Sequence, residues 1–383
     1  MRDICLIATA LLALWGQAAA AQVPGPPDCV GKVSWMGPPA HPAIPATAFD
    51  SPEILPTRSD DPALDDLLHR AASAMGATSM AAAVGDARGV WSGRVGETDQ
   101  PLYWWASAGK MATAIAILQM VEEGRVALDD PISRWIDGVP LGDRITLAML
   151  LEHTSGLYSA NEEASVRADP RFRTLGELVD VAAREGSLFC PGQAWRYSNT
   201  NYWLLGGVIE QVDGVPLAES LTRRIVQRAE LTGFRILAPD DAQADLVPAG
   251  EANAATGEVP ANPAWVGAAG PVAATPEAMI AFTRALLSGR LLDRETVVGQ
   301  LARSWPMFGQ PQFYGRGLML YEPPDRPGVM WIGHSGGAPG VRTVVVWSPT
   351  DQAFASVAIS GPGSAEAVAN RLLQLRAASR GIR

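Results

Sequence analysis

The chain has 383 residues, with 30 Lys and Arg residues against 40 Asp and Glu residues and a formal net charge of -10. This length allows two domains or one large two-part fold, and 48% apolar with 18% charged residues is typical of a globular protein rather than a disordered one. The acidic balance argues against a nucleic-acid partner, because phosphate binding needs a basic surface. Only two basic residues are lysines, Lys32 and Lys110.

The first 21 residues have the pattern of a secretory signal peptide. Arg2 precedes an apolar run over residues 4–15, which is too short to span a bilayer, and small residues at 18–21 precede a predicted cleavage before Gln22. No later apolar run is long enough to span a membrane. We therefore expect an exported protein, periplasmic or secreted, with no stable membrane span in the mature chain.

A proline-rich stretch over residues 22–58 shows no periodicity and is typical of an extended leader. It contains Cys29, and one other cysteine, Cys190, remains once Cys5 is removed with the signal peptide. In an exported protein the two remaining cysteines form one disulfide or stay as free thiols, and the sequence leaves both open.

Strand-like runs occur towards both ends of the folded region, and helical patterns lie between them. This order predicts an α/β (α+β) fold with an antiparallel sheet flanked by helices, built from residues 59–124 and 268–383, and an inserted all-helical subdomain over residues 125–267. The predicted elements are a helix from residue 61, a strand hairpin at 79–84 and 89–95, helices at 107–123, 201–212 and 276–287, β-rich runs at 313–320, 329–333, 341–347 and 353–359, and a helix at 364–378.

The helix predicted to begin at Ser107 carries the first candidate site. Its side chains are apolar on all sides, so we expect it to be buried, yet its first turn holds Ser107 and Lys110 on one face. Burial and the positive end of the helix dipole both lower the pKa of a lysine, towards an amine that exchanges protons with a neighbouring hydroxyl. The same dipole favours an alkoxide or oxyanion at Ser107.

Two further polar segments lie at the ends of predicted helices or strands. Tyr197 and Asn199 lie just before the helix at 201–212; a nearby ammonium would lower the pKa of the tyrosine, and the asparagine offers a donor and an acceptor to a substrate amide. The segment His334-Ser335-Gly336-Gly337 lies between two β-rich runs. Its glycines allow close backbone approach, and the Gly337 N–H is a candidate oxyanion donor.

With these three groups in this order, the sequence resembles the serine β-lactamase and penicillin-binding-protein-like superfamily, in its class C-like branch. That branch carries S-x-x-K, Y-x-N and K-T-G or H-x-G motifs, and it includes D-alanyl-D-alanine carboxypeptidases, D-aminopeptidases, esterases and class C β-lactamases. The resemblance covers about residues 62–360 and includes the text LLEHTSGL at 150–157 and PGQAWRYSNTNYWLLGGVI at 191–209.

The resemblance implies a β-lactamase/transpeptidase-like fold and an acyl-enzyme mechanism. Ser107 would be the nucleophile, and Lys110 and Tyr197 would manage its proton and that of the leaving group; the sequence leaves open which takes the first proton. Asn199, His334, Ser335 and Gly337 would bind substrate, and the N–H groups of Ser107 and Gly337 would form the oxyanion hole. This chemistry needs no metal and no organic cofactor. The partner would be a small-molecule or short-peptide substrate.

One departure from the family bears on the substrate. Class C β-lactamases have lysine where His334 stands, and a neutral histidine binds a carboxylate less well. The resemblance therefore favours D-amino-acid peptides, amides or esters over β-lactams as substrates. The alternatives are a class C-type β-lactamase and a slowly acylating penicillin-binding or sensor protein without turnover. Arg316, Arg326 and Arg342 are candidate carboxylate anchors, although each is more simply a surface arginine.

Other motifs are set aside. Residues 333–337 match the G-x-S-x-G elbow of α/β-hydrolases, but no histidine follows Ser335 to complete a triad. Four histidines without paired Cys/His spacing argue against zinc. We give His153 a structural role only, and we interpret the tryptophans near the motifs as core residues, with a substrate-facing wall as the alternative; they are Trp104, Trp105, Trp195 and Trp203.

Overall fold

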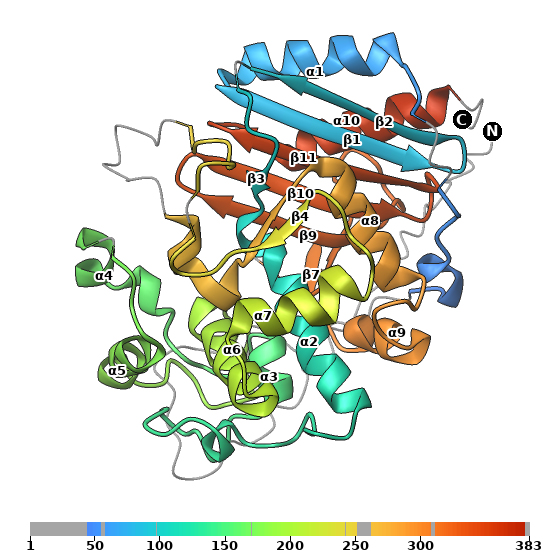
Figure 1. Ribbon diagram of the computed structural model, residues 1–383. Coiled ribbons are helices and arrows are strands. Elements are labelled where there is room, and N and C mark those ends of the chain that lie inside the picture. Colours follow the sequence, from blue (N-terminus) through green and yellow to red (C-terminus); the bar gives the residue numbers. More distant parts are fainter. Residues whose placement is uncertain are drawn as a thin grey trace, which may run out of the picture.

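An eight-stranded sheet, in which every neighbouring pair of strands is antiparallel, forms the upper part of the computed structural model (Figure 1). In spatial order its strands are β2 (Gly89–Val95), β1 (Ser79–Asp86), β11 (Ala353–Ser360), β10 (Val341–Ser348), β9 (Trp331–Ala338), β8 (Met319–Tyr321), β7 (Gln312–Tyr314) and β6 (Trp305–Pro306). The structure describes residues 44–54, 58–96, 98–169, 171–241, 243–250, 262–307 and 311–379. The predicted signal peptide, Cys29 and most of the predicted leader lie outside these ranges.

The sheet joins the two ends of the chain. Strand β1 pairs with β11 in a register that places Ser79 opposite Ser360, and β2 closes the adjacent edge as the second strand of a hairpin with β1. The predicted fold class, an antiparallel sheet flanked by helices and built from both ends, is confirmed. The division of the chain into subdomains stays a prediction.

Alternate residues of the strands pack into two different cores, as the pleat requires. On one face, the α1 (Pro62–Met75) and α10 (Ala365–Ala378) helices pack against each other and against the sheet (Figure 1). Asp61 caps α1 by accepting from the N–H groups of residues 63 and 64, and Gly76 ends it with φ 65°. On the other face lie α8 (Pro276–Leu287) and α2 (Lys110–Glu122).

Helix α2 is the most deeply buried helix of the described chain, with every side chain from Lys110 to Met120 buried. It runs away from the sheet beside a group of helices (Figure 1). These are α3 (Leu147–Leu151), α4 (Ala164–Ala168), α5 (Leu175–Glu185), α6 (Asn199–Asp213), α7 (Leu217–Leu221) and a π-helix (Thr222–Gln227), while α9 (Arg294–Ala302) follows α8.

A small second sheet leads the chain into the candidate site. Its order is β3 (Tyr103–Trp104), β5 (Val272–Ala274) and β4 (Phe234–Ile236), and a 3₁₀ turn, η2 (Ala106–Gly109), connects β3 to α2. A second 3₁₀ segment, η6 (Pro263–Ala269), precedes β5. None of the described helices is long and apolar enough to cross a membrane.

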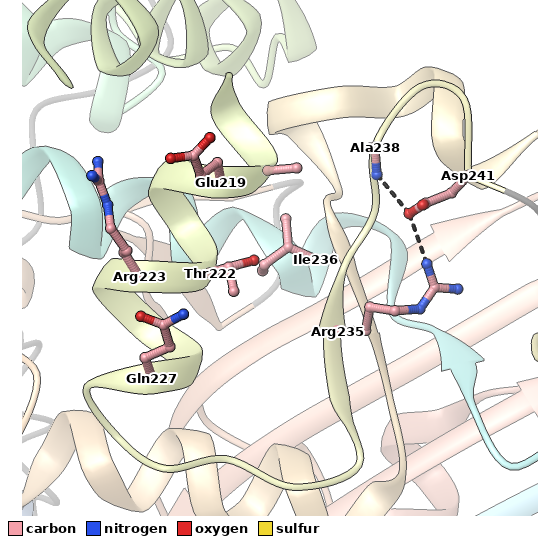
Figure 2. A pocket seen from close by; sticks show the side chains of 9 residues that line it. Glu219, Thr222, Arg223, Gln227, Arg235, Ile236, Ala238 and Asp241 are labelled. Atoms are coloured by element: carbon pink, nitrogen blue, oxygen red, sulfur yellow. Dashed lines mark hydrogen bonds and ion pairs between the residues drawn. The ribbon is translucent and has the colours of Figure 1, made fainter. Parts of the chain in front are cut away.

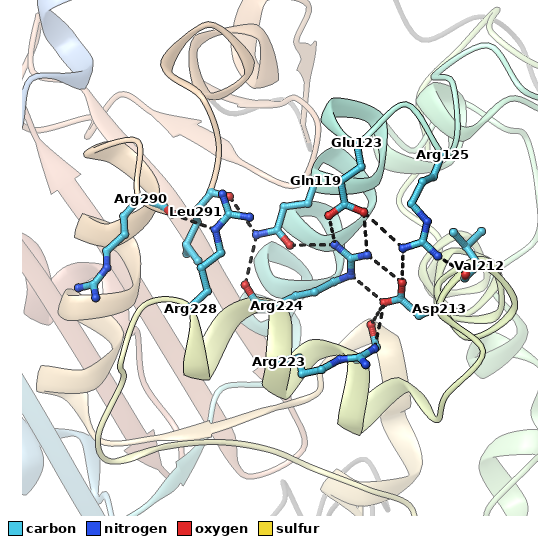
Figure 3. Close-up of polar contacts among 11 residues, drawn as sticks. Gln119, Glu123, Arg125, Val212, Asp213, Arg223, Arg224, Arg228, Arg290 and Leu291 are labelled. Carbon is cyan, nitrogen blue, oxygen red and sulfur yellow. Dashed lines mark hydrogen bonds and ion pairs between the residues drawn. The ribbon is translucent and has the colours of Figure 1, made fainter.

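An ion-pair cluster joins the far ends of α2 and α6 to the π-helix (Figure 3). The Arg224 guanidinium binds Asp213 through Nε and Nη2, at 2.7 and 2.8 Å, and binds both carboxylate oxygens of Glu123. Arg125 adds a second ion pair to Asp213. Because the Asp213 carboxylate is 4% exposed, these partners hold its pKa well below the usual range. The cluster fixes the C-terminal ends of the two helices whose N-terminal ends carry Lys110 and Asn199.

Candidate active site

Ser107 lies in η2, immediately before the buried helix α2. The preceding residue, Ala106, has φ 45°, a left-handed conformation that a non-glycine residue adopts at some cost. Ser107 is partly exposed, whereas Lys110, the only lysine among the described residues, is fully buried. The predicted helix at 107–123 is confirmed as α2, except that its first turn is 3₁₀.

The Lys110 amine contacts three oxygen atoms. Nζ lies 2.7 Å from Oδ1 of Asn199, 2.7 Å from the carbonyl oxygen of Ala269 and 3.2 Å from Oγ of Ser107. Burial lowers the pKa of Lys110 well below its ordinary value, which favours the neutral amine. A neutral amine has two N–H bonds and one lone pair. In the neutral form the two closer oxygens, which have no proton to give, accept both N–H bonds and leave the lone pair for the Ser107 hydroxyl.

Tyr197 lies beside this amine, which sits 4.9 Å from the centre of its ring. Its hydroxyl is buried and makes no hydrogen bond of standard geometry to any described residue. Burial raises the pKa of Tyr197, and the neighbouring Ser107 hydroxyl opposes this rise only in part. The pKa of Tyr197 is therefore raised and not lowered as expected, because burial removes the hydration of the phenolate.

Asn199 is the first residue of α6, two residues earlier than the predicted start of this helix. Its Oδ1 accepts from Lys110, its Nδ2 donates to Oδ1 of Asn161 at 3.0 Å, and its backbone N–H donates to Oγ of Ser159 at 2.9 Å. Ser159 also donates to Asn161 at 2.8 Å. In this structure both functions of the Asn199 amide are engaged with the protein.

Three contributors to the site were absent from the predictions: Ser159, Asn161 and Ala269. Ser159 lies immediately before a 3₁₀ turn (Ala160–Glu162) and Asn161 lies within it. Ala269 contributes only its backbone carbonyl. A backbone carbonyl leaves no side-chain signal in a sequence. For Ser159 and Asn161, the sequence offers one signal of a role in the site, which is that they closely follow the HTSGL segment.

The His334–Gly337 segment lies within strand β9 and not between strands, because the strand runs to Ala338 and pairs with β10 along its length. This corrects the predicted end of the strand at residue 333. Strand β9 packs against η2 so closely that a Cβ atom on Gly336 would lie 2.2 Å from the Trp105 carbonyl oxygen and 3.0 Å from the Ser107 nitrogen. Gly337, by contrast, is exposed and a Cβ there would meet open space.

The His334 imidazole is 1% exposed and engaged on both sides. Nε2 lies 3.1 Å from the Tyr314 hydroxyl, and Nδ1 lies 2.6 Å from the Ser335 carbonyl oxygen. Burial lowers its pKa to about 3, so the ring is neutral at physiological pH. The Ser335 hydroxyl lies 3.9 Å from the Met319 sulfur. The role of these two side chains in substrate binding stays a prediction.

The candidate carboxylate anchors have protein partners. Arg316 donates to the buried Glu152 at 2.9 Å, Arg326 binds Asp351 through two nitrogens, and Arg342 donates to the carbonyls of its own turn. Each contact ties a loop or turn to its neighbour, as expected of structural arginines.

The tryptophans near the motifs divide into two groups. Trp104, Trp105 and Trp195 are buried, as core residues are. Trp203 is half-buried and lines an apolar pocket of about 240 Å³ together with Phe172 and Trp265, beside η6. Cys190 is disulfide-bonded, and its partner lies outside the described residues.

A larger hollow of about 500 Å³ opens elsewhere, between the π-helix and β4 (Figure 2). The Arg235 guanidinium on its wall donates to Asp241 at 2.7 Å, and the same carboxylate accepts from the backbone of Ala238. None of the predicted site residues lines it. The chemistry-bearing motifs therefore converge at η2, α6 and β9, and not at this hollow.

Comparison with known proteins shows which family the chain belongs to. The Beta-lactamase family model matches residues 64–379. The chain belongs to this family. A D-stereospecific amidohydrolase from Streptomyces sp. is similar in structure, with a TM-score of 0.70 and 30% identity over 81% of this chain and 97% of that one. The resemblance inferred from the motifs is confirmed, and the chain is a serine hydrolase of this family.

Curated relatives share shorter segments. A penicillin-binding protein of Bacillus subtilis is 26% identical over 268 residues, which cover 64% of this chain and 57% of the relative. Esterase EstB of Burkholderia gladioli is 34% identical over 148 residues, covering 34% of this chain and 37% of the esterase. The chain therefore spans little more than half of the first relative and about a third of the second.

Proposed function

We propose that this protein is an exported serine hydrolase that cleaves D-amino-acid peptides or amides, or esters, through an acyl-enzyme at Ser107. The observation that carries the proposal is the arrangement of Lys110: two fixed acceptors lie 2.7 Å from its nitrogen, so that in the neutral form its lone pair is left for the Ser107 hydroxyl. Such an amine is a base held next to a nucleophile, which is the arrangement covalent catalysis requires.

In the first step, the Ser107 proton passes to Nζ of Lys110 while Oγ attacks the substrate carbonyl carbon. The carbonyl oxygen becomes an oxyanion, and the N–H groups of Ser107 and Gly337 are proposed to bind it. Gly336 supports this assignment, because its lack of a side chain lets β9 approach the Ser107 nitrogen.

In the second step, the tetrahedral intermediate collapses and the bond to the leaving group breaks. Burial raises the pKa of Tyr197, so its hydroxyl is protonated. This hydroxyl is proposed to give its proton to the departing amine nitrogen or alcohol oxygen, and the resulting phenolate then takes a proton from Lys110. Water then attacks the acyl carbon while Lys110 again accepts a proton. Lys110 returns this proton to Oγ of Ser107 as the bond between Oγ and the acyl carbon breaks and the acid product leaves.

The substrate class rests on two observations. The amidohydrolase, 97% of whose chain is covered by the similarity, is described as D-stereospecific. The similarity to the esterase covers 37% of the esterase. In addition, His334 is buried and neutral and offers no cation to the carboxylate of a β-lactam. Asn199 and Ser335, which are partly exposed, would contribute to the substrate-facing wall, and the buried His334 would support this wall from behind.

The test gives purified protein a D-amino-acid amide, a D-Ala-D-Ala peptide, a p-nitrophenyl ester and a labelled penicillin, each beside Ser107→Ala. We expect turnover of an amide, peptide or ester that the variant lacks. Equal rates in both proteins would remove Ser107 as the nucleophile. Penicillin turnover would instead support a class C-type β-lactamase, and stable labelling without turnover would support a sensor. Cell fractionation tests export.

A further inference from the structure

His153 lies directly behind Tyr197, in the loop that follows α3. Its side chain is fully buried, and its backbone has φ 59°, a left-handed conformation unusual for histidine. Ala106, next to the nucleophile, is another non-glycine residue with positive φ close to the site. Strained backbone of this kind persists where the surrounding contacts hold it firmly.

Three contacts connect His153 to the Tyr197 segment. The Arg196 N–H donates to the His153 carbonyl at 3.1 Å, and the Ser198 N–H donates to Nδ1 of the imidazole at 3.2 Å. The imidazole stacks on the Tyr197 phenol with ring centres 4.2 Å apart and planes 34° apart. One residue therefore holds the N–H groups of the residues before and after Tyr197 and also contacts one face of its ring.

The hydrogen bonds also fix the protonation state of the ring. An amide N–H only donates, so Nδ1 carries a lone pair and the single proton of the neutral ring is on Nε2. The Asn201 amide donates to the same nitrogen at 3.2 Å, an orientation set by its oxygen, which accepts from Ser155. Burial lowers the pKa of His153 and keeps it in this neutral form.

Aromatic rings close the remaining sides of the imidazole. Tyr314 and Tyr202 lie 4.6 and 5.2 Å from it between ring centres, and Trp195 approaches edge-on at 6.3 Å. The imidazole therefore has no room to turn away from Tyr197.

We propose that His153 is a positioning residue for the acylation step: through the Ser198 N–H and the stacked ring it sets where the Tyr197 hydroxyl and the Asn199 amide stand relative to Ser107 and Lys110. The inference rests on the proposed acyl-enzyme function at Ser107 and adds to it a residue that the sequence assigns to structure alone. A displacement of the order of 1 Å at a catalytic group can lower a rate by about 100-fold.

Two variants separate the two kinds of contact. His153→Asn places an acceptor near the position of Nδ1 and tolerates positive φ, but it lacks the ring. His153→Phe keeps a ring and leaves the Ser198 N–H without an acceptor. Thr154→Val is the matched control: this neighbour is equally buried, and its hydroxyl has no partner among the described residues.

The measurement is the acylation rate constant per active site, with sites counted by burst titration using a chromogenic ester or amide. We expect a fall of about 10- to 100-fold for either His153 variant with KM changed less than about threefold, and a change within about twofold for Thr154→Val. Fewer titratable sites that react at the wild-type rate would show a merely structural role and overturn the inference.

A double-mutant cycle with Tyr197→Phe gives an independent readout. If His153 acts through the Tyr197 hydroxyl, His153→Asn adds little to the loss already caused by Tyr197→Phe, whereas additive losses overturn the inference. Should His153→Phe fail to fold, this cycle still decides the question. If the wild-type protein is not acylated at Ser107 at all, the proposed function fails and the inference fails with it; acylation of wild type with unchanged variants overturns the inference alone.

Discussion

Oδ1 of Asn199 accepts a hydrogen bond from Nζ of Lys110 at 2.7 Å. Asn199→Asp puts a carboxylate at this position with almost no change in shape. An anion so close raises the pKa of Lys110, which favours the protonated amine at neutral pH and leaves no lone pair for Ser107. We expect kcat/KM at neutral pH to fall about 10- to 1000-fold and to recover as the pH is raised.

The control is Asn199→Ala, which removes the amide without adding charge. It should lower kcat/KM at every pH without moving the profile. A profile for Asn199→Asp that coincides in shape with that of wild type would contradict a neutral Lys110.

The wild-type pH profile is itself predictable in sign. Burial lowers the pKa of Lys110 well below 10.5, so kcat/KM should rise with pH as this amine loses its proton and level off well before that value. Burial raises the pKa of Tyr197 above 10.0, so no decline from its ionisation should occur on the alkaline side below that pH. A rate still rising towards the ordinary lysine pKa would count against the assigned base.

Alanine substitutions at the two adjacent glycines of β9, Gly336 and Gly337, should differ sharply in their effect on kcat. Gly336→Ala would place a methyl group 2.2 Å from the Trp105 carbonyl oxygen, which must push β9 away from η2 and separate the two oxyanion donors. We expect a loss of about 100-fold or more in kcat. Gly337→Ala keeps its N–H and directs its methyl group into open space, so kcat should stay within a fewfold of wild type. Similar losses in both variants would contradict the close packing of β9 on η2.

The ion-pair cluster of Figure 3 should stabilise the fold without taking part in the reaction. Asp213→Ala leaves the 10% exposed Arg224 guanidinium short of a partner, and we expect a loss of about 3 kcal/mol in the free energy of unfolding. Urea unfolding measures this loss, while acylation per titrated site should stay unchanged. Asp66→Ala, which breaks an exposed pair with Arg70, is the matched control and should cost less than about 1 kcal/mol.

The pH dependence of the same cluster follows from its depressed carboxylate. Because the pKa of Asp213 is lower in the folded state than its ordinary 3.8, its contribution to stability is complete above that value and is lost as the pH falls further. Wild type should therefore lose stability in this acid range more steeply than Asp213→Asn. Parallel curves would show that the carboxylate is not strongly paired.

Patterns of charge and hydrophobicity were enough to predict the frame of the site. A helix that is apolar on all sides yet begins with Ser107 and Lys110 must bury an amine, and the structure buries it fully. The helix at 276–287 was predicted with its observed bounds, since Thr275 caps it and Pro276 opens it. Strand β9 was predicted too short, because glycines in its second half lack the side chains that mark a strand.

What escaped prediction depends on contacts between distant segments. The carbonyl of Ala269 and the side chain of Asn161 reach the site only because η6 and the loop after α3 fold back towards α2 and α6. The pKa of Tyr197 depends on how deeply its hydroxyl is buried, which no spacing of motifs specifies. His153 looked structural because nothing in the sequence shows that its ring lies against Tyr197.

The pairing of β1 with β11 sets the order in which this enzyme can mature. Ser79 pairs with Ser360, from near the opposite end of the described chain. Because such pairs are far apart in the sequence, the contact order of the central sheet is high and we expect the sheet to form slowly. A growing chain displays Ser107 and Lys110 long before β9 exists to complete the site beside them. A chain cut short before β9 would keep the proposed nucleophile and its base but lack Gly337, the second proposed oxyanion donor, so we expect it to show no hydrolytic activity.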